Sequence, residues 1–514
     1  MTTPPSISRP HPLKRGQCAL LIFILLAGAF LRFYDIARAS LWMDEIWSIE
    51  ISTGRGSAHD RLPTGVIQKT PINLTSLENA PSSWHIWNSM NGVTHPPLYH
   101  LLLRWWMDAF SNSPAAARSL SAVLSLLSVL VFFDLCRHLH SPRIALLAAA
   151  IMALSPAQIE FAQEARSYPM LIFLCLLAAA ALVRIEKFGP ARARGLAVTL
   201  SIMAAALTHY FALGVIAALA IYSLLRNPRT LIPPFLAAAL TLPWLWGPEL
   251  YFQIHSLPPG GPGFLHSDDP NHPQQAALHM IGLTGQWLLG QKNAATLPPA
   301  ALILLTAVAI LWPLLRLPWR KDTLLWLLWL ALTAGPLAIS DIFHQSNFLE
   351  YLRYTILAAP AACALLASLD WPHRPLIRDT GAWCAIALAA IFAVARIHEG
   401  PPTKEDWRGL ATQLNHEAAP GELLVFYGND PWLSPGMWYT GFTYYAPHSP
   451  RPWLILNSPP DAPLMQQLNE YHSLWLIGRY PSQQGPTLLP GWQPTPDQWI
   501  TTAGAACRMV RSPR

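Results

Sequence analysis

Charged residues are scarce in this sequence, since only 12% of its 514 residues are Asp, Glu, Lys or Arg. Soluble domains usually contain about 25% charged residues. The hydrophobic content of 52% exceeds what a water-soluble chain of this length could bury, so the sequence predicts an integral membrane protein. Lysine is especially rare, with six residues against twenty-eight arginines. Together with the abundant Ala and Leu, this composition is typical of bacterial proteins from GC-rich genomes.

Other features are missing as well. The six cysteines form no CxxC pair, so we expect neither a zinc site nor a disulfide framework. The net charge of +6 comes from basic residues scattered over short loops rather than from a continuous stripe. This distribution argues against nucleic acid as a partner.

Long apolar runs, by contrast, are abundant, and a membrane-spanning helix needs about 20 mostly apolar residues. The first run is followed by Phe33, Tyr34 and Asp35 rather than by a small-residue cleavage site, so we expect a retained span and not a signal peptide. We predict an α-helical polytopic membrane protein with about eleven spans. They lie near 17–33, 117–135, 144–156, 168–183, 195–208, 210–225, 230–246, 297–315, 323–340, 354–369 and 381–396.

The basic residues predict the orientation, because Lys and Arg concentrate in cytoplasmic loops. Alternating the loops from a cytoplasmic N-terminus leaves few basic residues in the short outer connections, mainly Arg166 and Arg353. The cytoplasmic set is Arg9, Lys14, Arg15, Arg137, Arg143, Arg184, Lys187, Arg192, Arg194, Arg226, Arg229, Arg316, Arg320, Lys321, Arg374 and Arg378. We expect a multi-pass protein of the inner (plasma) membrane with a cytoplasmic N-terminus.

Two long outer loops are expected within a transmembrane domain that covers residues 1–396. The loop 35–115 is polar and rich in Trp, and Pro96-Pro97 within it favours a helix from Leu98 to Trp106 at the membrane interface. The loop 247–296 is rich in Pro, Gly and His. We predict that this second loop is a flexible lid.

The C-terminal segment, residues 397–514, is soluble in character and is expected outside the cytoplasm. Strands are predicted at 422–427, 453–456 and 474–477, with a helix from Pro463 to Tyr471 between the last two. This alternation indicates a small α/β domain. The segment contains no GxGxxG sequence and no P-loop, so nucleotide binding has no support.

Two adjacent carboxylates, Asp44 and Glu45, lie between tryptophans directly after the first predicted span. One interpretation is a solvated acidic turn. The other is that Asp44 accepts a proton from an attacking hydroxyl while Glu45 orients it or helps to hold a metal. With His95, the two carboxylates would suit a divalent cation.

The segment around His95 and Tyr99 is a second candidate. His95 at the start of the interfacial helix is either a capping or surface histidine, or a contact to a donor phosphate or metal. A third candidate, between spans three and four, contains Glu164, Arg166 and Tyr168. It is either an exposed ion pair or a phosphate site, for which the planar guanidinium of Arg166 is suited.

Two further polar pairs lie in outer connections. His209 and Tyr210 belong either to an interfacial aromatic belt or to the lining of a sugar pocket. Arg353, followed by Tyr354, either extends to lipid phosphates at the surface or clamps the phosphate of a substrate lipid. All these clusters are predicted on the same side of the membrane, where the head of a polyprenyl-phosphate sugar would lie. Its leaving group is already a phosphate, so arginines or a cation can stabilise the departing charge.

These motifs resemble those of GT-C fold glycosyltransferases of the family 39 type, the group of protein O-mannosyltransferases and lipid A aminoarabinose transferases. The resemblance covers roughly residues 17–400, and Glu405 to Gly409 looks like the start of the extramembrane domain in bacterial members. It rests on Asp44-Glu45, His95-Pro96-Pro97-Leu98-Tyr99, Gln163-Glu164-Ala165-Arg166-Ser167-Tyr168, Thr208-His209-Tyr210 and Arg353-Tyr354.

The resemblance implies an inverting transfer from a dolichyl- or undecaprenyl-phosphate sugar to a hydroxyl of a lipid, glycan or protein. It implies that Asp44 is the base, with Glu45 as its companion, and that Arg166 and Arg353 contact the donor phosphate. Metal dependence varies within the family. The C-terminal domain is unlike the repeat domains of eukaryotic O-mannosyltransferases, which argues against a protein acceptor.

Two other functions compete with this interpretation. A transporter or flippase of lipid-linked sugars usually carries ionisable residues within its spans and shows inverted repeats, but the spans here are almost free of charge and no repeat is evident. A non-catalytic subunit of a glycan-assembly pathway is the second alternative, against which the intact Asp44-Glu45 pair argues.

Overall fold

The computed structural model describes most of the chain as two compact units. The first contains described residues of 1–36, 94–99 and 118–400, and the second those of 37–93, 100–117 and 401–514. The basic residues Arg9, Arg316, Arg320, Arg374 and Arg378 lie outside the described residues, as does part of the predicted lid. The described residues are 13–90, 93, 95–256, 266–269, 271–311, 321–369, 379–399, 404–428, 434–479, 481–502 and 504–511.

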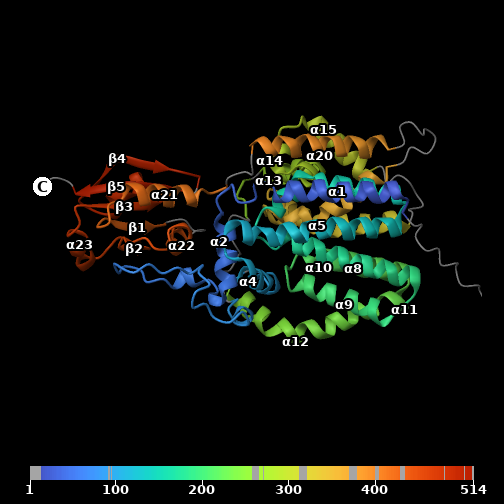
Figure 1. Ribbon diagram of the computed structural model, residues 1–514, viewed down its shortest axis with the longest axis horizontal. Helices are drawn as coiled ribbons and strands as arrows, with labels where there is room; N and C mark the ends of the chain where they lie inside the picture. Colours follow the sequence, from blue (N-terminus) through green and yellow to red (C-terminus); the bar gives the residue numbers. More distant parts are fainter. Residues whose placement is uncertain are drawn as a thin grey trace, which may run out of the picture. The chain divides into compact units, whose positions relative to one another are not determined.

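The first unit consists of helices, and several of them, such as α8, α9 and α10, run side by side (Figure 1). Over its described residues, every apolar run of the sequence coincides with a helical segment. The segments are α1 (Arg15–Phe33), α5 (Pro114–Leu139), α6 (Pro142–Leu154), α7 (Pro156–Ala162), α8 (Tyr168–Phe188), α9 (Arg192–Ala206), α10 (Ala212–Arg226), α11 (Pro228–Leu231), α12 (Pro233–Ser256), α13 (His272–Leu289), α14 (Gln291–Ala294), α15 (Pro299–Thr306), η4 (Ala307–Leu311), α17 (Lys321–His344), α18 (Leu352–Thr355), η5 (Ile356–Ala358), α19 (Ala359–Ala367) and α20 (Thr380–Glu399).

Six helices in the described part of the chain are long and apolar enough to cross a membrane, and the bent pair α6–α7 would make a seventh span. Three shorter apolar helices also coincide with predicted spans, at 212–226, 299–310 and 352–367. The chain is therefore a multi-pass membrane protein, while the number of eleven crossings stays a prediction. The six long spans are 15–33, 114–139, 168–188, 228–255, 323–344 and 380–398.

The segment 247–296 differs from the predicted flexible loop, because most of its described residues are helical. Helix α12 continues through Pro243 and Pro248 to Ser256, as membrane helices often tolerate proline. Helix α13 follows, and its residues Trp287 and Leu288 are buried in the hydrophobic core. Polar His, Gln and Thr residues lower the hydropathy of α13, so its sequence does not indicate a core helix.

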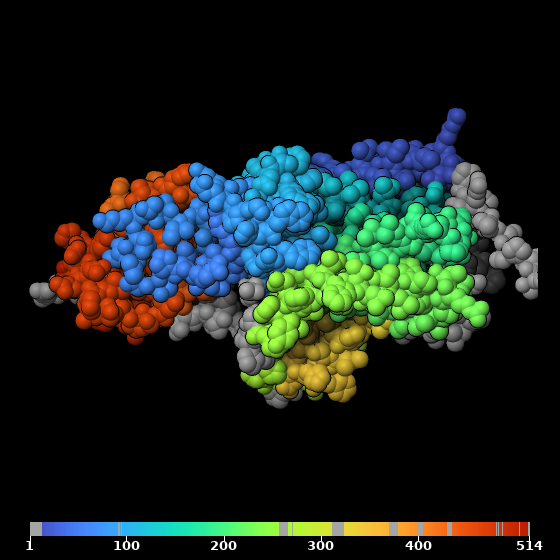
Figure 2. Space-filling view, turned by 90° about the horizontal axis from the view of Figure 1, so that it is seen from below, coloured from blue at the N-terminus to red at the C-terminus, as the bar shows by residue number. Residues whose placement is uncertain are grey.

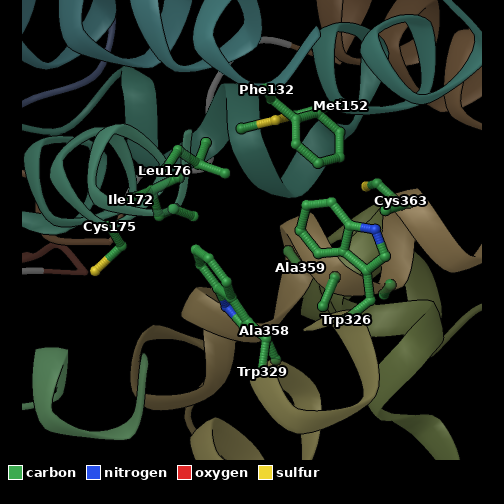
Figure 3. Packing of buried hydrophobic residues seen from close by; sticks show 14 of the residues in the cluster. Phe132, Met152, Ile172, Cys175, Leu176, Trp326, Trp329, Ala358, Ala359 and Cys363 are labelled. Atoms are coloured by element: carbon green, nitrogen blue, oxygen red, sulfur yellow. The ribbon is translucent and has the colours of Figure 1, made fainter. Parts of the chain in front are cut away.

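The core of the first unit is formed by large aromatic side chains packed against small ones. Trp326 and Trp329 of α17 are fully buried and lie close to Ala358 and Ala359 (Figure 3). The indole of Trp329 donates a hydrogen bond to the Leu357 carbonyl at 2.8 Å. This packing joins α17 to the segment η5–α19, and it thereby fixes the helix that follows Arg353 and Tyr354.

The second unit combines the first long loop with the C-terminal segment. The helix predicted from Leu98 is present as α4, which starts in the first unit and continues in the second. The elements are α2 (Met43–Glu50), η1 (Ile51–Arg55), η2 (Ala58–Arg61), α3 (His85–Asn88), α4 (Leu98–Phe110), α21 (Trp407–Glu417), β1 (Leu423–Tyr427), α22 (Pro435–Tyr445), β2 (Trp453–Leu456), α23 (Ala462–Leu468), β3 (Ser473–Gly478), α24 (Pro481–Leu488), β4 (Trp492–Ile500) and β5 (Ala505–Arg511).

The five strands form one mixed sheet in the order β2-β1-β3-β5-β4. Strand β1 pairs in parallel with β2 and β3, where Val425 lies opposite Leu454 and Leu476. Strands β3, β5 and β4 pair antiparallel. The continuous apolar run of β1 is typical of a strand that is buried on both faces. The α/β domain and its first three strands are confirmed, while β4 and β5 were not predicted.

Residues of the first loop complete one edge of this sheet. The Gln68 backbone exchanges two hydrogen bonds with Trp453 of β2, each of 2.8 Å, and Gly65 N donates to the Ile455 carbonyl at 2.9 Å. The Tyr439 ring stacks on that of Trp453. Its hydroxyl accepts the N–H of Ile72, which lies in the first loop, and so adds to the contact between loop and sheet. Loop and C-terminal segment therefore form one folded unit, and Figure 2 shows the loop residues in blue against the C-terminal residues in red.

Candidate active site

The connection between α7 and α8 covers residues 163–167, and each of the two helices has a proline in its first turn. Ser155 caps α7 by accepting the Gln158 N–H, and Pro156 occupies the first turn, a position that tolerates proline well. Pro169 has the same place in α8. The side chains between these helices are buried, with Glu164 at 6% and Arg166 at 5% exposure. Arg166 is therefore held in a compact turn and is not an exposed ion-pair partner.

Arg166 lies against two aromatic rings in this turn. Its Nη2 donates to Nε2 of His95 at 3.2 Å, and its Cζ lies 5.8 Å from the centre of the Tyr168 ring. The Ser121 hydroxyl donates to the Arg166 carbonyl at 3.1 Å. The guanidinium is thus largely desolvated and orientated before any ligand binds.

His209, in the connection between α9 and α10, continues the cluster. Its ring lies 4.7 Å from that of His95 and stacks on Phe211 at 4.7 Å. Its Nδ1 accepts the Phe211 N–H at 3.2 Å. Burial, together with the nearby charge of Arg166, lowers the pKa of His209 to about 3. The ring is therefore neutral at physiological pH.

A neutral His209 whose Nδ1 accepts a hydrogen bond carries its proton on Nε2. This Nε2 is buried and has no hydrogen-bond partner among the described residues. A buried N–H without a partner costs about 1–3 kcal/mol. The cluster therefore contains a donor that fits an oxygen atom of a ligand.

Aromatic residues from a distant part of the sequence extend the cluster. The ring of Phe211 lies edge-on to Tyr354 at 5.5 Å, and Phe348 contacts Tyr354 at 5.4 Å. The Cζ of Arg353 lies 5.1 Å from the ring centres of both Tyr351 and Tyr354. The second predicted arginine thus belongs to a continuous chain of ring contacts that leads to His209.

Helix α12 fixes the backbone of His95. Gln253 Nε2 donates to the His95 carbonyl at 3.0 Å, and Gln253 Oε1 accepts the Tyr210 hydroxyl. The Trp246 indole in turn donates to the Tyr210 oxygen at 3.1 Å. The sequence did not indicate roles for Gln253 and Trp246, because no local pattern distinguishes them from other residues near the end of a span.

The structure thus joins most of the predicted residues of the first unit in one place. Arg166, His95, His209, Tyr168 and Tyr354 are linked by direct contacts, Tyr210 is linked through Gln253, and Arg353 through Tyr354. Tyr99 is buried in the first turn of α4, and the Glu164 carbonyl accepts the Arg166 N–H at 2.8 Å. The roles of the Tyr99 and Glu164 side chains stay predictions.

The two predicted carboxylates lie in the second unit, in the first turn of α2. Glu45 is fully buried, and its Oε2 accepts the Trp42 N–H at 3.2 Å. This is the capping arrangement in which a side chain in the first turn satisfies a backbone donor before it. Asp44 is partly exposed. Asp44 is therefore the carboxylate of the pair that solvent or a ligand can reach.

The described residues contain no group of three or more His, Cys, Asp or Glu side chains arranged to hold a metal ion. The expected cation ligands Asp44, Glu45 and His95 belong to different units, and a metal site formed by them stays a prediction of the sequence.

The sequence model of the dolichyl-phosphate-mannose-protein mannosyltransferase family matches residues 94–246. This range includes His95, Arg166 and His209 but not Asp44. No curated protein matches the chain.

Solved structures match almost the whole chain. ArnT from Cupriavidus metallidurans in the apo state shares 14% identity with a TM-score of 0.57, and the match covers 97% of this chain and 99% of that one. The Archaeoglobus fulgidus oligosaccharyltransferase in the apo form shares 12% identity with a TM-score of 0.51, over 92% of this chain and 71% of that one. The oligosaccharyltransferase AglB from Archaeoglobus fulgidus, in complex with an inhibitory peptide and a dolichol-phosphate, shares 10% identity with a TM-score of 0.50, over 92% of this chain and 70% of that one. The whole-chain likeness shows that this protein has the GT-C fold, and together with the family match over residues 94–246 it supports a membrane glycosyltransferase.

Proposed function

We propose that this glycosyltransferase moves a sugar from a polyprenyl-phosphate donor to a hydroxyl of a lipid, glycan or protein acceptor at the outer face of the membrane. The donor lipid is undecaprenyl phosphate or a related polyprenyl phosphate. The observation that carries the proposal is the buried cluster of Arg166, His95 and His209. It offers a preorganised cation and an N–H donor without a partner, a combination suited to a phosphate oxygen.

Each part of the donor would contact a different part of this cluster. Arg166 and His209 bind the phosphate, and Arg353 over its two tyrosines binds it from a second side. Tyr168 and Tyr354 line the pocket in which the sugar lies, because aromatic faces and hydroxyls suit a sugar ring. Tyr99, Tyr210 and Glu164 complete the walls.

The transfer itself is an inverting displacement. The acceptor oxygen attacks the anomeric carbon of the sugar, and the bond from that carbon to the phosphate oxygen breaks. The electron pair of the broken bond goes to the phosphate, where Arg166 stabilises the developing charge. Asp44 takes the proton of the acceptor hydroxyl, and Glu45 holds the turn that presents Asp44.

The comparisons support the use of a lipid-linked donor. The family that matches residues 94–246 is named for dolichyl-phosphate-mannose. One structure of similar fold contains a dolichol-phosphate. The distribution of basic residues supports an outer location of the site, because Arg137, Arg184 and Arg226 lie at the helix ends opposite to those that carry the cluster. By the same argument, residues 397–514 form an extracytoplasmic domain and the N-terminus is cytoplasmic.

The test is transfer of labelled sugar from a panel of polyprenyl-phosphate sugars by the purified protein in proteoliposomes. Native membranes supply the acceptors, and the Asp44→Asn variant is assayed beside the wild type. We expect the wild type alone to release free polyprenyl phosphate together with a glycosylated acceptor. Loss of a general base typically costs about 10²–10⁴-fold in rate. An Asp44→Asn variant with full turnover would contradict the role of Asp44, and a folded wild type inactive with every donor would contradict the donor class.

A further inference from the structure

The first turn of α2 is held by residues from the opposite end of the chain. The first N–H groups of a helix have no partner within it. At α2 one of these donors, Met43 N, donates to Oε2 of Glu405 at 2.7 Å. Glu405 lies 362 positions further along the sequence, at the start of the C-terminal domain. One cap of the helix that carries Asp44 therefore comes from that domain.

The Glu405 carboxylate is itself fixed. The same oxygen accepts the indole N–H of Trp407 at 2.8 Å, and the Trp407 side chain is fully buried against Trp438. The preceding residue, Lys404, places its Nζ 4.1 Å from the centre of the Trp42 ring. Residues 404–407 thus hold both residues that precede Asp44 in the chain.

The chain before α2 is held by the same domain. Arg408 donates to the carbonyls of Ala37 at 2.9 Å and Arg38 at 3.1 Å. The Tyr445 hydroxyl of α22 accepts the Leu41 N–H at 2.7 Å. The path of the chain into α2 is therefore determined by a row of contacts, of which the Glu405 cap is the last before Asp44.

The charges around Glu405 fit a carboxylate with this task. The pKa of Glu405 is raised, and the largest cause is burial, to which the charge of Asp44 adds. The hydrogen bonds from Trp407 and Met43 and the charge of Lys404 lower the pKa by less. Of the neighbouring charged groups, Glu45 caps Trp42, Asp406 caps α21 through the Gly409 N–H, and Arg408 binds the carbonyls named above. A group in this position acts through its acceptor oxygen, whether it is ionised or not.

We propose that Glu405 is a positioning residue for the transfer reaction, which fixes the first turn of α2 and with it the place of Asp44. The inference rests on the proposed role of Asp44 as proton acceptor. It assigns the C-terminal domain a direct part in the placement of Asp44. Glu405 touches no reacting atom, and its effect is transmitted by the backbone of Trp42 and Met43.

Two variants at Glu405, assayed in the full-length protein in proteoliposomes, test this proposal. Glu405→Ala removes the acceptor oxygen, and we expect kcat to fall at least tenfold, since a misplacement of about 1 Å can cost on the order of 100-fold. The KM for the donor should stay within about twofold, because Arg166 and Arg353 bind the donor phosphate. Glu405→Gln keeps one oxygen that can accept both N–H groups, so it should restore kcat to within about threefold of the wild type.

The matched control is Glu422→Ala in the same domain. Glu422 is also a buried carboxylate, and it accepts hydrogen bonds from Trp475 at 3.1 Å and Arg508 at 2.8 Å. Among the described residues, α2 donates no hydrogen bond to it. This variant should lower the melting temperature of the domain and leave kcat of the folded protein unchanged. It separates a general loss of stability from a loss of position.

The outcomes distinguish the inference from the proposed function. If Asp44→Asn is inactive while Glu405→Ala keeps the kcat of the wild type, the positioning role is refuted and the base assignment stands. The role is also refuted if Glu405→Gln is as impaired as Glu405→Ala, or if Glu422→Ala lowers kcat equally. If Asp44→Asn keeps full activity, both assignments are refuted.

Discussion

Replacing Arg166 by Gln tests the phosphate site most directly. The guanidinium is already buried and held by His95 and Tyr168, so it needs little further desolvation or ordering when a phosphate binds. Hydrogen bonds that involve a charged group contribute about 1.5–3 kcal/mol. With about 1.4 kcal/mol per factor of ten, the loss of this contact should lower kcat/KM for the donor by about 10- to 150-fold.

Part of this loss should appear in kcat, because negative charge grows on the phosphate as the bond to the sugar breaks. Arg166→Lys should be intermediate, since an ammonium group keeps the charge but not the fork of donors. The assay is release of polyprenyl phosphate at varied donor concentration.

The control is Arg184→Gln on the same helix, α8. Arg184 pairs with Asp134 and lies at the far end of the helix from Tyr168, so its loss should leave donor kinetics unchanged. Folding of each variant is checked by its melting temperature. If folded Arg166→Gln keeps kcat/KM within twofold of the wild type, the assignment of the phosphate site to this cluster is wrong.

Two other residues give independent predictions. His209→Phe keeps the ring stacking and removes the Nε2–H, so kcat/KM should fall by about 2- to 13-fold, the contribution of a neutral hydrogen bond. Because the pKa of His209 is about 3, the pH–rate profile of the variant above pH 5 should have the same shape as that of the wild type. A shifted profile would contradict a neutral ring. For His59, burial lowers the pKa, but the hydrogen bond and charge of Glu50 raise it by more. The protonated pair therefore stabilises the fold below about pH 6.5, the unfolded value, and this stability is lost as pH rises through the higher folded pKa. The melting temperature should fall over that range, and in His59→Gln the fall should be smaller; an equal fall in both proteins would refute the role of this pair.

Much of the membrane unit follows from the sequence, because apolar runs specify membrane helices almost by themselves. Arg166, His95 and His209 were predicted on one side of the membrane from the alternation of loops alone. Their proximity within a few ångströms depends on how α8, α9 and α12 pack, which no local pattern encodes.

The missed residues share a physical cause. Gln253 lies beyond Pro243 and Pro248, which are signals for a helix end in soluble proteins, yet α12 continues to Ser256. Glu405 lies next to a sequence that indicates the start of a helix, and nothing local shows that its carboxylate caps a helix more than 350 positions earlier. Long-range caps of this kind come from tertiary structure and are invisible to periodicity.

The edge of the sheet that is completed by Gly65 and Gln68 has a consequence for aggregation. An open strand edge is a template for pairing with another chain. At the opposite edge, β4 carries Pro494, Pro496 and an exposed Asp497, which oppose such pairing, whereas β2 depends on the loop for its cover. A soluble fragment that begins at residue 404 would expose the β2 edge and should self-associate. A fragment that also supplies residues 65–68 should remain monomeric.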